Sequence, residues 1–355
     1  MRRGLALTLT VAMLGSLLAG CGSSGGGSAP KADATAAAAP AGGGTEEVTT
    51  PDKVLKFTDQ NAEDSPAGMW EQKFADLVKE YTKGHIEVEL YFNNTLCGYD
   101  IQPLQAGICD FIQYVPSSAG DLDSRLGAFD APYIYRDADH RLAVFDPFNS
   151  EPLKVINEAL KDDGVMLLSS FNSGYRQITC NFPIRNLSDM KGAKIRVVPS
   201  DLYQQLFTAF GAAATPMAFS EVPTALITNV IDGQENPYSV IVSSALYEVQ
   251  KYCMETNHLP TNHGLWMNRN TYESLTPEQQ EAVLKAAYDA SAYMDKYILD
   301  KMEEYKKICE DNGMEIIDAE NGLDIDGFKA AAENVYDYFA EDWGDMPDLI
   351  RAVQP

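Results

Sequence analysis

The hydrophobic pattern from residue 53 onward switches repeatedly between the spacing of strands and the spacing of helices. KVLKFTD (53–59) is rich in apolar residues and HIEVELYF (85–92) alternates apolar with polar ones, so both predict strands. Between them, apolar residues recur at spacings of four, three and four and predict a helix; they are Trp70, Phe74, Leu77 and Tyr81. A short helix near 100–106 and a strand at CDFIQY (109–114) follow. This β-α-β-α-β order predicts a parallel sheet with helices on both faces.

A second unit of the same kind begins at GVMLLSSF (164–171). It continues through the strands RQITC (176–180) and AKIRVV (193–198) into a helix from Ser200 to Phe210. Two α/β units joined by strands that cross between them predict two lobes with a cleft between them.

The longest helical pattern lies between Thr276 and Asn312. TPEQ (276–279) is a capping box, and Asn312 followed by Gly313 is a stop signal. The apolar stripe of this segment consists of Val283, Ala287, Ala290, Met294, Ile298, Met302 and Tyr305. A helix of about 35 residues would be about 50 Å long, which exceeds the width of one lobe. We therefore expect it to run along both lobes.

The start of the chain predicts an export signal. Two arginines precede an apolar run from Leu5 to Leu18, which is too short to cross a bilayer of about 30 Å. Small residues directly before Cys21 form a lipobox, so we expect a lipoprotein signal peptide over 1–20 and a lipid on Cys21. A plain signal peptide with an incidental cysteine is the alternative. Residues 21–51 are rich in Gly, Ser, Ala and Thr and predict a flexible, lipid-anchored tether.

Composition and charge narrow the possible partners. The 355 residues are 45% hydrophobic and 22% charged, which is enough apolar material for one large domain or two of ordinary size. Once Arg2 and Arg3 leave with the signal, 25 basic residues face 52 acidic ones, a formal net charge of −27. This charge argues against nucleic acid as a partner. A site for an anion must rely on local cations.

The cysteines and histidines form no metal or redox motif. Besides Cys21 there are five cysteines, an odd number that cannot all pair: Cys97, Cys109, Cys180, Cys253 and Cys309. A bridge between Cys97 and Cys109 and five free thiols both remain open. No zinc-binding spacing relates the four histidines, which we expect to be structural or exposed: His85, His140, His258 and His263. We expect neither a metal nor a cofactor.

No catalytic motif singles out an enzyme. The chain has no G-x-S-x-G elbow, no H-E-x-x-H, no P-loop and no strand-linked G-x-G-x-x-G. With 52 acidic residues, a carboxylate pair for glycoside hydrolysis stays open, although no residues single out such a pair. A secreted hydrolase acting on acidic saccharides is therefore kept as an alternative from a different class.

Two arginines occupy positions that suit an anion. Arg176 opens the strand RQITC, and Arg196 lies near the carboxyl end of AKIRVV, before the loop that starts a helix. Ligands of open α/β sheets bind outside the carboxyl ends of strands, where helix N-termini also point. A guanidinium can hold a carboxylate there through two parallel hydrogen bonds. On these residues alone, the interpretation of both arginines as surface residues with packed stems is the favoured one.

A run of motifs in the second unit resembles a known family. The segments GYRQITCNFPIRNLSDMKGAKIRVVPS, GAAATPMAFSEVPTALITNVIDGQENP and YEVQKYCMETNH are similar to the solute-binding receptors of TRAP transporters, the tripartite ATP-independent periplasmic importers of the DctP-like family. In that family one arginine opens an R-x-x-T strand, a second lies in D-x-K-G-x-K-x-R-V, and P-M-x-F-x-E-V-x-x-A-L leads to D-G-Q-E-N-P. The resemblance spans roughly Leu55 to Gly322.

The resemblance implies a two-lobe α/β receptor of the periplasmic-binding-protein, or Venus-flytrap, architecture, with the long helix spanning both lobes. Such a receptor closes over a small organic acid. Mapped by motif, Arg196 resembles the family's carboxylate clamp, and Arg176 and Asn236 resemble its two helpers. Phe219 resembles a pocket aromatic that packs on the carbon skeleton of the ligand.

The stretch DGQENP (232–237) has two interpretations. A surface turn is the plain one, whereas the resemblance assigns Asn236 to the ligand and leaves Gln234 and Glu235 as scaffold or rim. The chain departs from the family pattern at Cys97 and in SPAGMW (65–70), where a glycine and a histidine-proline segment are usual. These departures leave the far end of the ligand open.

The sequence thus predicts an extracytoplasmic, lipid-anchored receptor that is no enzyme and that delivers a small organic acid to a TRAP permease. We expect a monomer with lobe I over 52–173 and 262–302, and lobe II over 174–261 and 303–355. The two arginines favour a hydroxylated acid such as a uronate or a related sugar acid. A dicarboxylate or a sulfonate would satisfy the same pair, and a sensor receptor feeding a signalling kinase is a further alternative.

Overall fold

The computed structural model of the protein describes Val48 and residues 50–354. The predicted signal peptide and the lipidated Cys21 lie outside these residues, as does nearly all of the predicted tether, so these three assignments stay predictions. No helix in the described part of the chain combines the length and the hydrophobicity needed to cross a bilayer.

The first sheet has five strands in the order β2-β1-β3-β10-β4. Their bounds are β1 (Lys53–Thr58), β2 (Ile86–Tyr91), β3 (Phe111–Tyr114), β4 (Val165–Asn172) and β10 (Asn262–Asn268). β1 pairs in parallel with β2 and β3, whereas β10 runs antiparallel to β3 and β4. The predicted parallel sheet is therefore wrong for this unit, because a strand that returns from the second unit is inserted antiparallel between β3 and β4.

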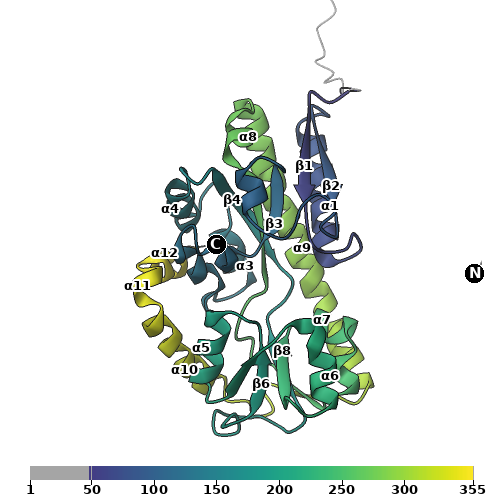
Figure 1. Cartoon of the computed structure of the whole chain (residues 1–355), viewed down its shortest axis with the longest axis vertical. Helices are drawn as coiled ribbons and strands as arrows, with labels where there is room; N and C mark the ends of the chain where they lie inside the picture. The colour runs from purple at the N-terminus through teal and green to yellow at the C-terminus, as the bar shows by residue number, and fades with distance from the viewer. Residues whose placement is uncertain (1–47, 49, 355) are drawn as a thin grey trace, which may run out of the picture. The chain divides into compact units, whose positions relative to one another are not determined.

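The second sheet has six strands in the order β11-β9-β5-β8-β6-β7. Their bounds are β5 (Gln177–Cys180), β6 (Lys194–Val197), β7 (Ala213–Pro216), β8 (Gly233–Asn236), β9 (Tyr252–Met254) and β11 (Glu315–Ile317). β5 is antiparallel to β8 and β9, while β6 is parallel to β7 and β8. Figure 1 shows the two sheets in the upper and lower parts of the molecule, which confirms the predicted two lobes.

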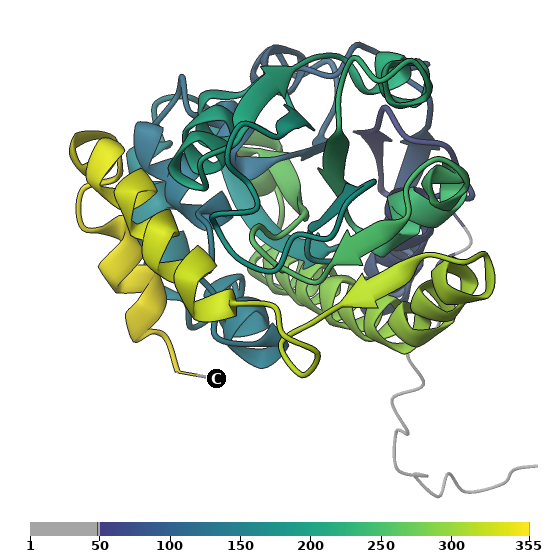
Figure 2. The same ribbon diagram turned by 90° about the horizontal axis from the view of Figure 1, so that it is seen from below.

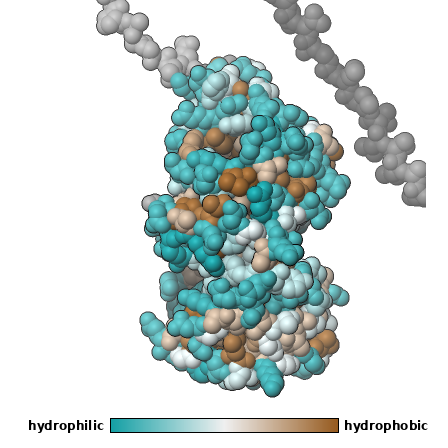
Figure 3. Space-filling view, turned by 90° about the vertical axis from the view of Figure 1, so that its left-hand side faces the viewer, coloured by the Kyte–Doolittle hydropathy of each residue, from teal (hydrophilic) through white to brown (hydrophobic). Residues whose placement is uncertain are grey.

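Helices connect the strands and cover the sheets. Their bounds are α1 (Pro66–Tyr81), α2 (Gln102–Gln105), α3 (Ala138–Val144), α4 (Glu151–Ala159), α5 (Asp201–Ala209), α6 (Val222–Ile227), α7 (Tyr238–Ser243), α8 (Arg269–Glu273), α9 (Pro277–Asp311), α10 (Ile325–Tyr338), α11 (Ala340–Trp343) and α12 (Met346–Ala352). In the space-filling view the two lobes form separate bulges joined by a narrower middle, and hydrophobic side chains gather in several patches among hydrophilic ones (Figure 3).

Two crossing segments join the sheets and lie side by side. The first leads from β4 to β5 and the second from β9 to β10. The backbone N–H of Ser173 donates to the carbonyl of Thr261 at 3.1 Å, and that of Arg176 donates to the carbonyl of Leu259 at 2.9 Å. Gly174 lies in the first crossing with φ +119°, a left-handed conformation that a residue with a Cβ rarely adopts.

The crossings fix the directions of the central strands. β4 runs toward the second sheet and β10 runs away from it, so the pairing makes β1 and β3 end toward the second sheet. β5 runs away from the first sheet, so β8 and β6 end toward it. The carboxyl ends of β1, β3, β6 and β8 therefore face one another across the space between the sheets, which is where α/β sheets bind ligands.

The helix α9 runs along both lobes, as the sequence predicts (Figure 1). It packs against α1 and β4 of the first lobe and against α7 and β11 of the second. Its capping box is formed, because the side chain of Thr276 accepts from the N–H of Gln279 and the side chain of Gln279 accepts from the N–H of Thr276. The predicted apolar stripe is buried from Val283 to Ile298, and the last two members are half-buried.

The chain turns back after α10. That helix packs against α5 of the second lobe, whereas α11 and α12 pack against α4 and the 3₁₀ helix at Ser124–Asp130 of the first lobe (Figures 1 and 2). The predicted lobe boundaries stay a prediction, and the packing favours placing α11 and α12 with lobe I.

A buried ion pair ties both crossings to α9. Nη1 of Arg141 donates to Oδ2 of Asp295 at 2.7 Å, and its Nε donates to Oδ1 of Asn262 at 2.8 Å. The other carboxylate oxygen of Asp295 accepts from the N–H of Asn172 at 2.7 Å. One guanidinium and one carboxylate thus hold the last residue of β4 and the first residue of β10 against the long helix.

Candidate ligand-binding site

Arg176 lies at the end of the first crossing, directly before β5, and is only 6% exposed. Its Nε donates to Oε2 of Glu235, and its Nη2 donates to Oε1 of Glu235 and to Oδ1 of Asn236, each at 2.9 Å. The ring centroid of Tyr203, from α5, is 5.3 Å from its Cζ. Burial acts to lower the pKa of Arg176, but the negative charge of Glu235 outweighs burial and raises that pKa. Its Nη1 has no partner among the residues that the structure describes.

Glu235 is the counter-ion that neutralises Arg176. Burial acts to raise the pKa of Glu235, but the charge of Arg176 and a hydrogen bond from His258 bring the pKa below its ordinary value. Nε2 of His258 is 3.4 Å from Oε2 of Glu235, and its Nδ1 is 2.8 Å from Oγ1 of Thr256. Burial lowers the pKa of His258, so this ring adds no charge at neutral pH.

Arg196 lies near the carboxyl end of β6 and is 3% exposed. Its Nε and Nη2 both donate to the carbonyl of Met217, at 3.0 and 2.9 Å. It forms no ion pair with the described residues, and its Nη1 makes no hydrogen bond to them. Burial lowers the pKa of Arg196, yet an arginine side chain keeps its charge in proteins. Arg196 is therefore a buried cation that nearby carboxylates do not pair with.

Phe219 stands beside this cation. Its ring centroid is 5.6 Å from Cζ of Arg196, and the residue is 36% exposed. An aromatic face so placed interacts favourably with a guanidinium and still offers apolar surface. The structure thus places Phe219 next to Arg196, and its role as a wall for the ligand stays a prediction.

The middle of the stretch Asp232–Pro237 is a buried strand, so the plain interpretation as a surface turn is wrong. Gly233 to Asn236 form β8, and all four residues are buried. A Cβ at Gly233 would lie 2.2 Å from the carbonyl oxygen of Thr179, so only glycine fits there. Gln234 donates to Oγ1 of Thr179 at 2.9 Å and accepts from Nδ2 of Asn236 at 2.5 Å. Asn236 is therefore held from both sides, by Gln234 and by Arg176.

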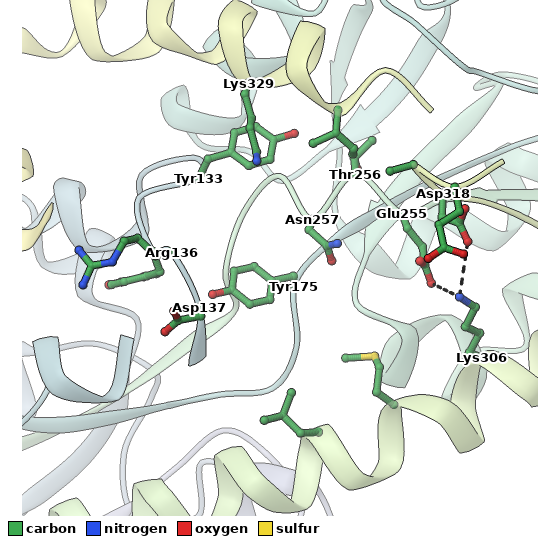
Figure 4. Close-up of a pocket in the computed structure, with 16 residues that line it drawn as sticks. Tyr133, Arg136, Asp137, Tyr175, Glu255, Thr256, Asn257, Lys306, Asp318 and Lys329 are labelled. Atoms are coloured by element: carbon green, nitrogen blue, oxygen red, sulfur yellow. Dashed lines mark ion pairs between the residues drawn. The ribbon is translucent and has the colours of Figure 1, made fainter. Parts of the chain in front are cut away.

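A large cavity lies elsewhere, beside α9 and α10 (Figure 4). It has a volume of about 680 Å³, and Tyr175 and Asn257 of the crossings line it, but none of the four predicted site residues does. Lys306 in its wall is 2.9 Å from Glu255 and 4.0 Å from Asp318, so carboxylates accompany this cation. Arg136 and Lys329 also line this cavity, but both are exposed to solvent, whereas Arg196 is buried. For an organic acid we therefore favour the space between the carboxyl ends of the strands, where Arg196 has no carboxylate partner.

Buried polar groups also gather at the carboxyl end of β1, where the sequence singles out no residue. Asp59 is 1% exposed and accepts hydrogen bonds from Nδ2 of Asn61, at 3.0 Å to each oxygen. Glu71 of α1 is fully buried, and its burial together with the nearby charge of Asp59 raises its pKa well above the ordinary value. Burial lowers the pKa of His263 to about 4. Burial thus favours the neutral forms of Glu71 and His263 beside Asp59.

Replacing Glu71 with glutamine should stabilise the protein increasingly as pH rises. Because the folded-state pKa of Glu71 lies above the unfolded one, the stability that this carboxyl contributes is complete below the unfolded pKa and is lost as pH rises through the folded pKa. The Tm of Glu71→Gln should therefore exceed that of the wild type more at about pH 8 than at about pH 4. Glu80→Gln, on an exposed position of the same helix, is the control. Parallel Tm curves against pH for all three proteins would contradict the expectation.

The cysteines settle one alternative that the sequence leaves open. All five cysteines of the described part are free, so Cys97 and Cys109 form no bridge in the structure. No group of three or more His, Cys, Asp or Glu side chains in that part could hold a metal ion.

Known proteins match this chain over most of its length. The family model of bacterial extracellular solute-binding protein family 7, DctP, matches residues 57–342. The 2,3-diketo-L-gulonate-binding periplasmic protein YiaO of Escherichia coli K12 is 30% identical over 303 residues, which cover 84% of this chain and 90% of YiaO. The C4-dicarboxylate-binding periplasmic protein DctP of Rhodobacter capsulatus is 29% identical over 263 residues, which cover 73% of this chain and 78% of that protein.

Solved structures show the same fold. A TRAP periplasmic solute-binding protein from Rhodobacter sphaeroides, in an open form without ligand, gives a TM-score of 0.78 at 29% identity and covers 85% of this chain and 99% of that chain. One from Xanthobacter autotrophicus Py2 with bound β-D-galacturonate gives 0.71 at 29% identity and covers 84% and 100%. The family match and these relatives place the chain in family 7 of the bacterial extracellular solute-binding proteins, the DctP family of TRAP transporter receptors.

Proposed function

We propose that this TRAP solute receptor captures a sugar acid, a uronate or a close relative, through a carboxylate bound to Arg196. The observation that carries the proposal is the buried, unpaired charge of Arg196 at the carboxyl end of β6. A buried cation is stable only when an anion or several acceptors neutralise it. A carboxylate on the ligand supplies that charge.

The neighbouring groups complete a carboxylate site. The Nη1 groups of Arg196 and Arg176 are both available, Asn236 is fixed by its neighbours, and Phe219 offers an apolar wall. Charge-assisted hydrogen bonds contribute about 1.5 to 3 kcal/mol each, and micromolar binding needs about 8 kcal/mol in total. Two such bonds with an amide and an apolar contact come within reach of that value.

The relatives support the sugar-acid class. YiaO is named for 2,3-diketo-L-gulonate, and solved TRAP receptors carry β-D-galacturonate, L-galactonate and β-D-glucuronate at 29%, 28% and 25% identity to this chain. Each of these ligands is a hydroxylated carboxylic acid. The name of the Rhodobacter capsulatus relative, in contrast, refers to C4-dicarboxylates, so a dicarboxylate is the competing ligand class.

Transport requires that the permease recognise the loaded receptor. A ligand that contacts both lobes stabilises the closed form in proportion to its preference for that form. We propose that the closed receptor, held at the outer face of the membrane by a lipid on Cys21, delivers its acid to the membrane subunits.

Fractionation of cells that express Cys21→Ser would test the lipid anchor, since this variant should be lost from the membrane fraction.

A thermal-shift screen of the purified receptor against organic acids tests the proposed ligand class. A ligand at about 1,000 times its Kd adds about 4 kcal/mol of stability, which corresponds to a Tm increase of about 10 °C for a chain of this size. We expect uronates or aldonates to give such an increase and the matching neutral sugars to give none. If only neutral sugars or no acids raise the Tm, the proposal is wrong.

A further inference from the structure

We propose that Cys97 and Cys109 are a reversible disulfide pair, which a disulfide oxidant outside the cytoplasm joins and which then ties the loop after β2 to the start of β3. The structure describes the reduced form, in which both thiols are free. The inference concerns the first lobe alone and does not depend on which ligand the receptor binds.

The two thiols are already in contact. Cys109 is 1% exposed, and the half-buried Cys97 packs against the hydrophobic core that contains Cys109. Their side chains hydrogen-bond to each other, and burial, followed by the proximity of Cys97, raises the pKa of Cys109 to about 12. A disulfide requires Cα atoms about 4.4 to 6.8 Å apart and side chains that converge, and a hydrogen-bonded thiol pair converges. Bond formation therefore needs only a small approach of the two sulfurs.

The surroundings hold Cys109 in place and leave Cys97 room to approach it. Asp110, the residue after Cys109, pairs with Lys56 of β1. Its N–H donates to the carbonyl of Lys56 at 2.9 Å, and its Oδ2 accepts from the N–H of Lys56 at 2.8 Å. Cys97 lies in the segment 92–101, which contains neither helix nor strand. The sheet thus fixes one partner, and the loop supplies the shift that the bond requires of the other.

The remaining cysteines of the described chain do not form such a pair. Sγ of Cys180 donates to the carbonyl of Asp232 at 3.3 Å. Cys253 lies near Cys309, but its thiol hydrogen-bonds with the phenol of Tyr238. All three of these cysteines are fully buried, so a reagent in solution does not reach them in the folded receptor. Cys97 is the accessible thiol with a second thiol beside it.

Thiol–disulfide exchange supplies the chemistry. The chain belongs to a family of extracellular proteins, and disulfides form and persist outside the cytoplasm. The thiolate of Cys97 attacks one sulfur of the oxidant and releases the other half as a thiol. Cys109 then gives up its proton and attacks Sγ of Cys97, and the second half of the oxidant leaves as a thiol. The two cysteines lose two electrons and two protons, and the oxidant disulfide becomes two thiols.

The bridge would constrain a short stretch next to the first sheet. It closes a loop of 13 residues, from 97 to 109, which contains α2. In the same stretch the hydroxyl of Tyr99 accepts from the N–H of Val115, directly after β3, at 3.1 Å. Restricting the unfolded chain by a loop of this length corresponds to a Tm increase of about 7 °C for a chain of this size.

Peptide mapping of the purified receptor tests the inference. The receptor is incubated with oxidised glutathione, and the remaining thiols are blocked with N-ethylmaleimide under denaturing conditions. Chymotrypsin, which cleaves after Tyr99, is used for digestion, because no lysine or arginine separates the two cysteines. We expect mass spectrometry to find the peptides of Cys97 and Cys109 joined, and dithiothreitol to separate them. Absence of this joined pair, including glutathione on Cys97 with Cys109 still a thiol, would overturn the inference.

The melting temperature gives a second readout. The oxidised wild type should melt about 7 °C above the reduced wild type, whereas Cys97→Ser should melt at the same temperature in both conditions. Cys180→Ser keeps a donor for the carbonyl of Asp232 and is the control, so it should keep the wild-type difference. If Cys97→Ser does not fold, the peptide map of the wild type decides. A wild-type difference that persists unchanged in Cys97→Ser would overturn the inference.

Discussion

Replacing Arg196 with alanine should abolish binding of the organic acid while the receptor stays folded. The unliganded protein loses two hydrogen bonds to the carbonyl of Met217 and the contact with the Phe219 ring, but no carboxylate partner is left unpaired. The complex loses the charge that holds the ligand carboxylate. Breaking a buried, hydrogen-bonded charge pair costs about 3 to 5 kcal/mol, which corresponds to at least a 100-fold loss of affinity. Isothermal titration calorimetry with the acid found in the screen measures this loss.

Lys194→Ala provides the matched control. Lys194 lies at the other end of the same strand and is exposed, so this variant removes a positive charge from β6 without touching the site. It should bind the acid as the wild type does. Equal ligand-induced Tm increases in the wild type and in Arg196→Ala would show that Arg196 does not hold the ligand.

Replacing Arg176 with methionine should instead cost mainly stability. The variant leaves the charge of Glu235 fully buried, with His258 as the one remaining side chain of the described residues that hydrogen-bonds it, and breaking a buried pair in this way costs about 3 to 5 kcal/mol. Urea unfolding at neutral pH measures this cost. The double variant Arg176→Met/Glu235→Gln should recover most of it, because no charge is then left unpaired. If the single variant is as stable as the wild type, the ion pair contributes nothing to the fold.

The pH dependence of the unfolding free energy shows whether the stability lost in Arg176→Met comes from the broken ion pair. Glu235 has a lowered pKa in the folded wild type, so it contributes stability above its unfolded pKa, and this contribution is lost as pH falls through the folded pKa. Without Arg176, the Glu235 carboxyl no longer contributes this stability above its unfolded pKa. The difference in unfolding free energy between wild type and Arg176→Met should therefore shrink once pH falls below about 4. A difference that is constant with pH would point to lost packing instead.

Ligand affinity also distinguishes the roles of Arg176 and Arg196. Arg176 uses Nε and Nη2 on Glu235 and Asn236, so only its Nη1 is available to a ligand. Arg196 carries the charge that no protein group neutralises. We therefore expect Arg176→Met to weaken binding less than Arg196→Ala does.

Local sequence signals predict those elements of this receptor whose causes are local. The capping box at Thr276, the apolar stripe and the stop at Asn312 together predict α9 to within a residue, because each acts over one or two helical turns. The period-two pattern of β2 and the proline after Ser65 at the start of α1 act over similar distances. The motifs around Arg176 and Arg196 also identify the family, which the family match confirms.

Features that depend on distant contacts were missed. The antiparallel position of β10 is decided by pairing with β3 and β4, about 90 to 160 residues away in the chain, and no local pattern carries that information. Glu235 reads as rim or scaffold until its partner 59 positions away is known. Asp59 and Glu71 stand among many acidic residues, and only burial distinguishes them. The one sequence feature that pointed to this region was a departure from the family pattern, in the segment SPAGMW directly before Glu71.

The return of α11 and α12 to the first lobe limits how the receptor can move. The lobes are linked by the paired crossings, by α9 and, on another side, by the turn from α10 into α11 around Phe339. Any change in the angle between the lobes must therefore be accommodated at this turn as well as at the crossings and α9.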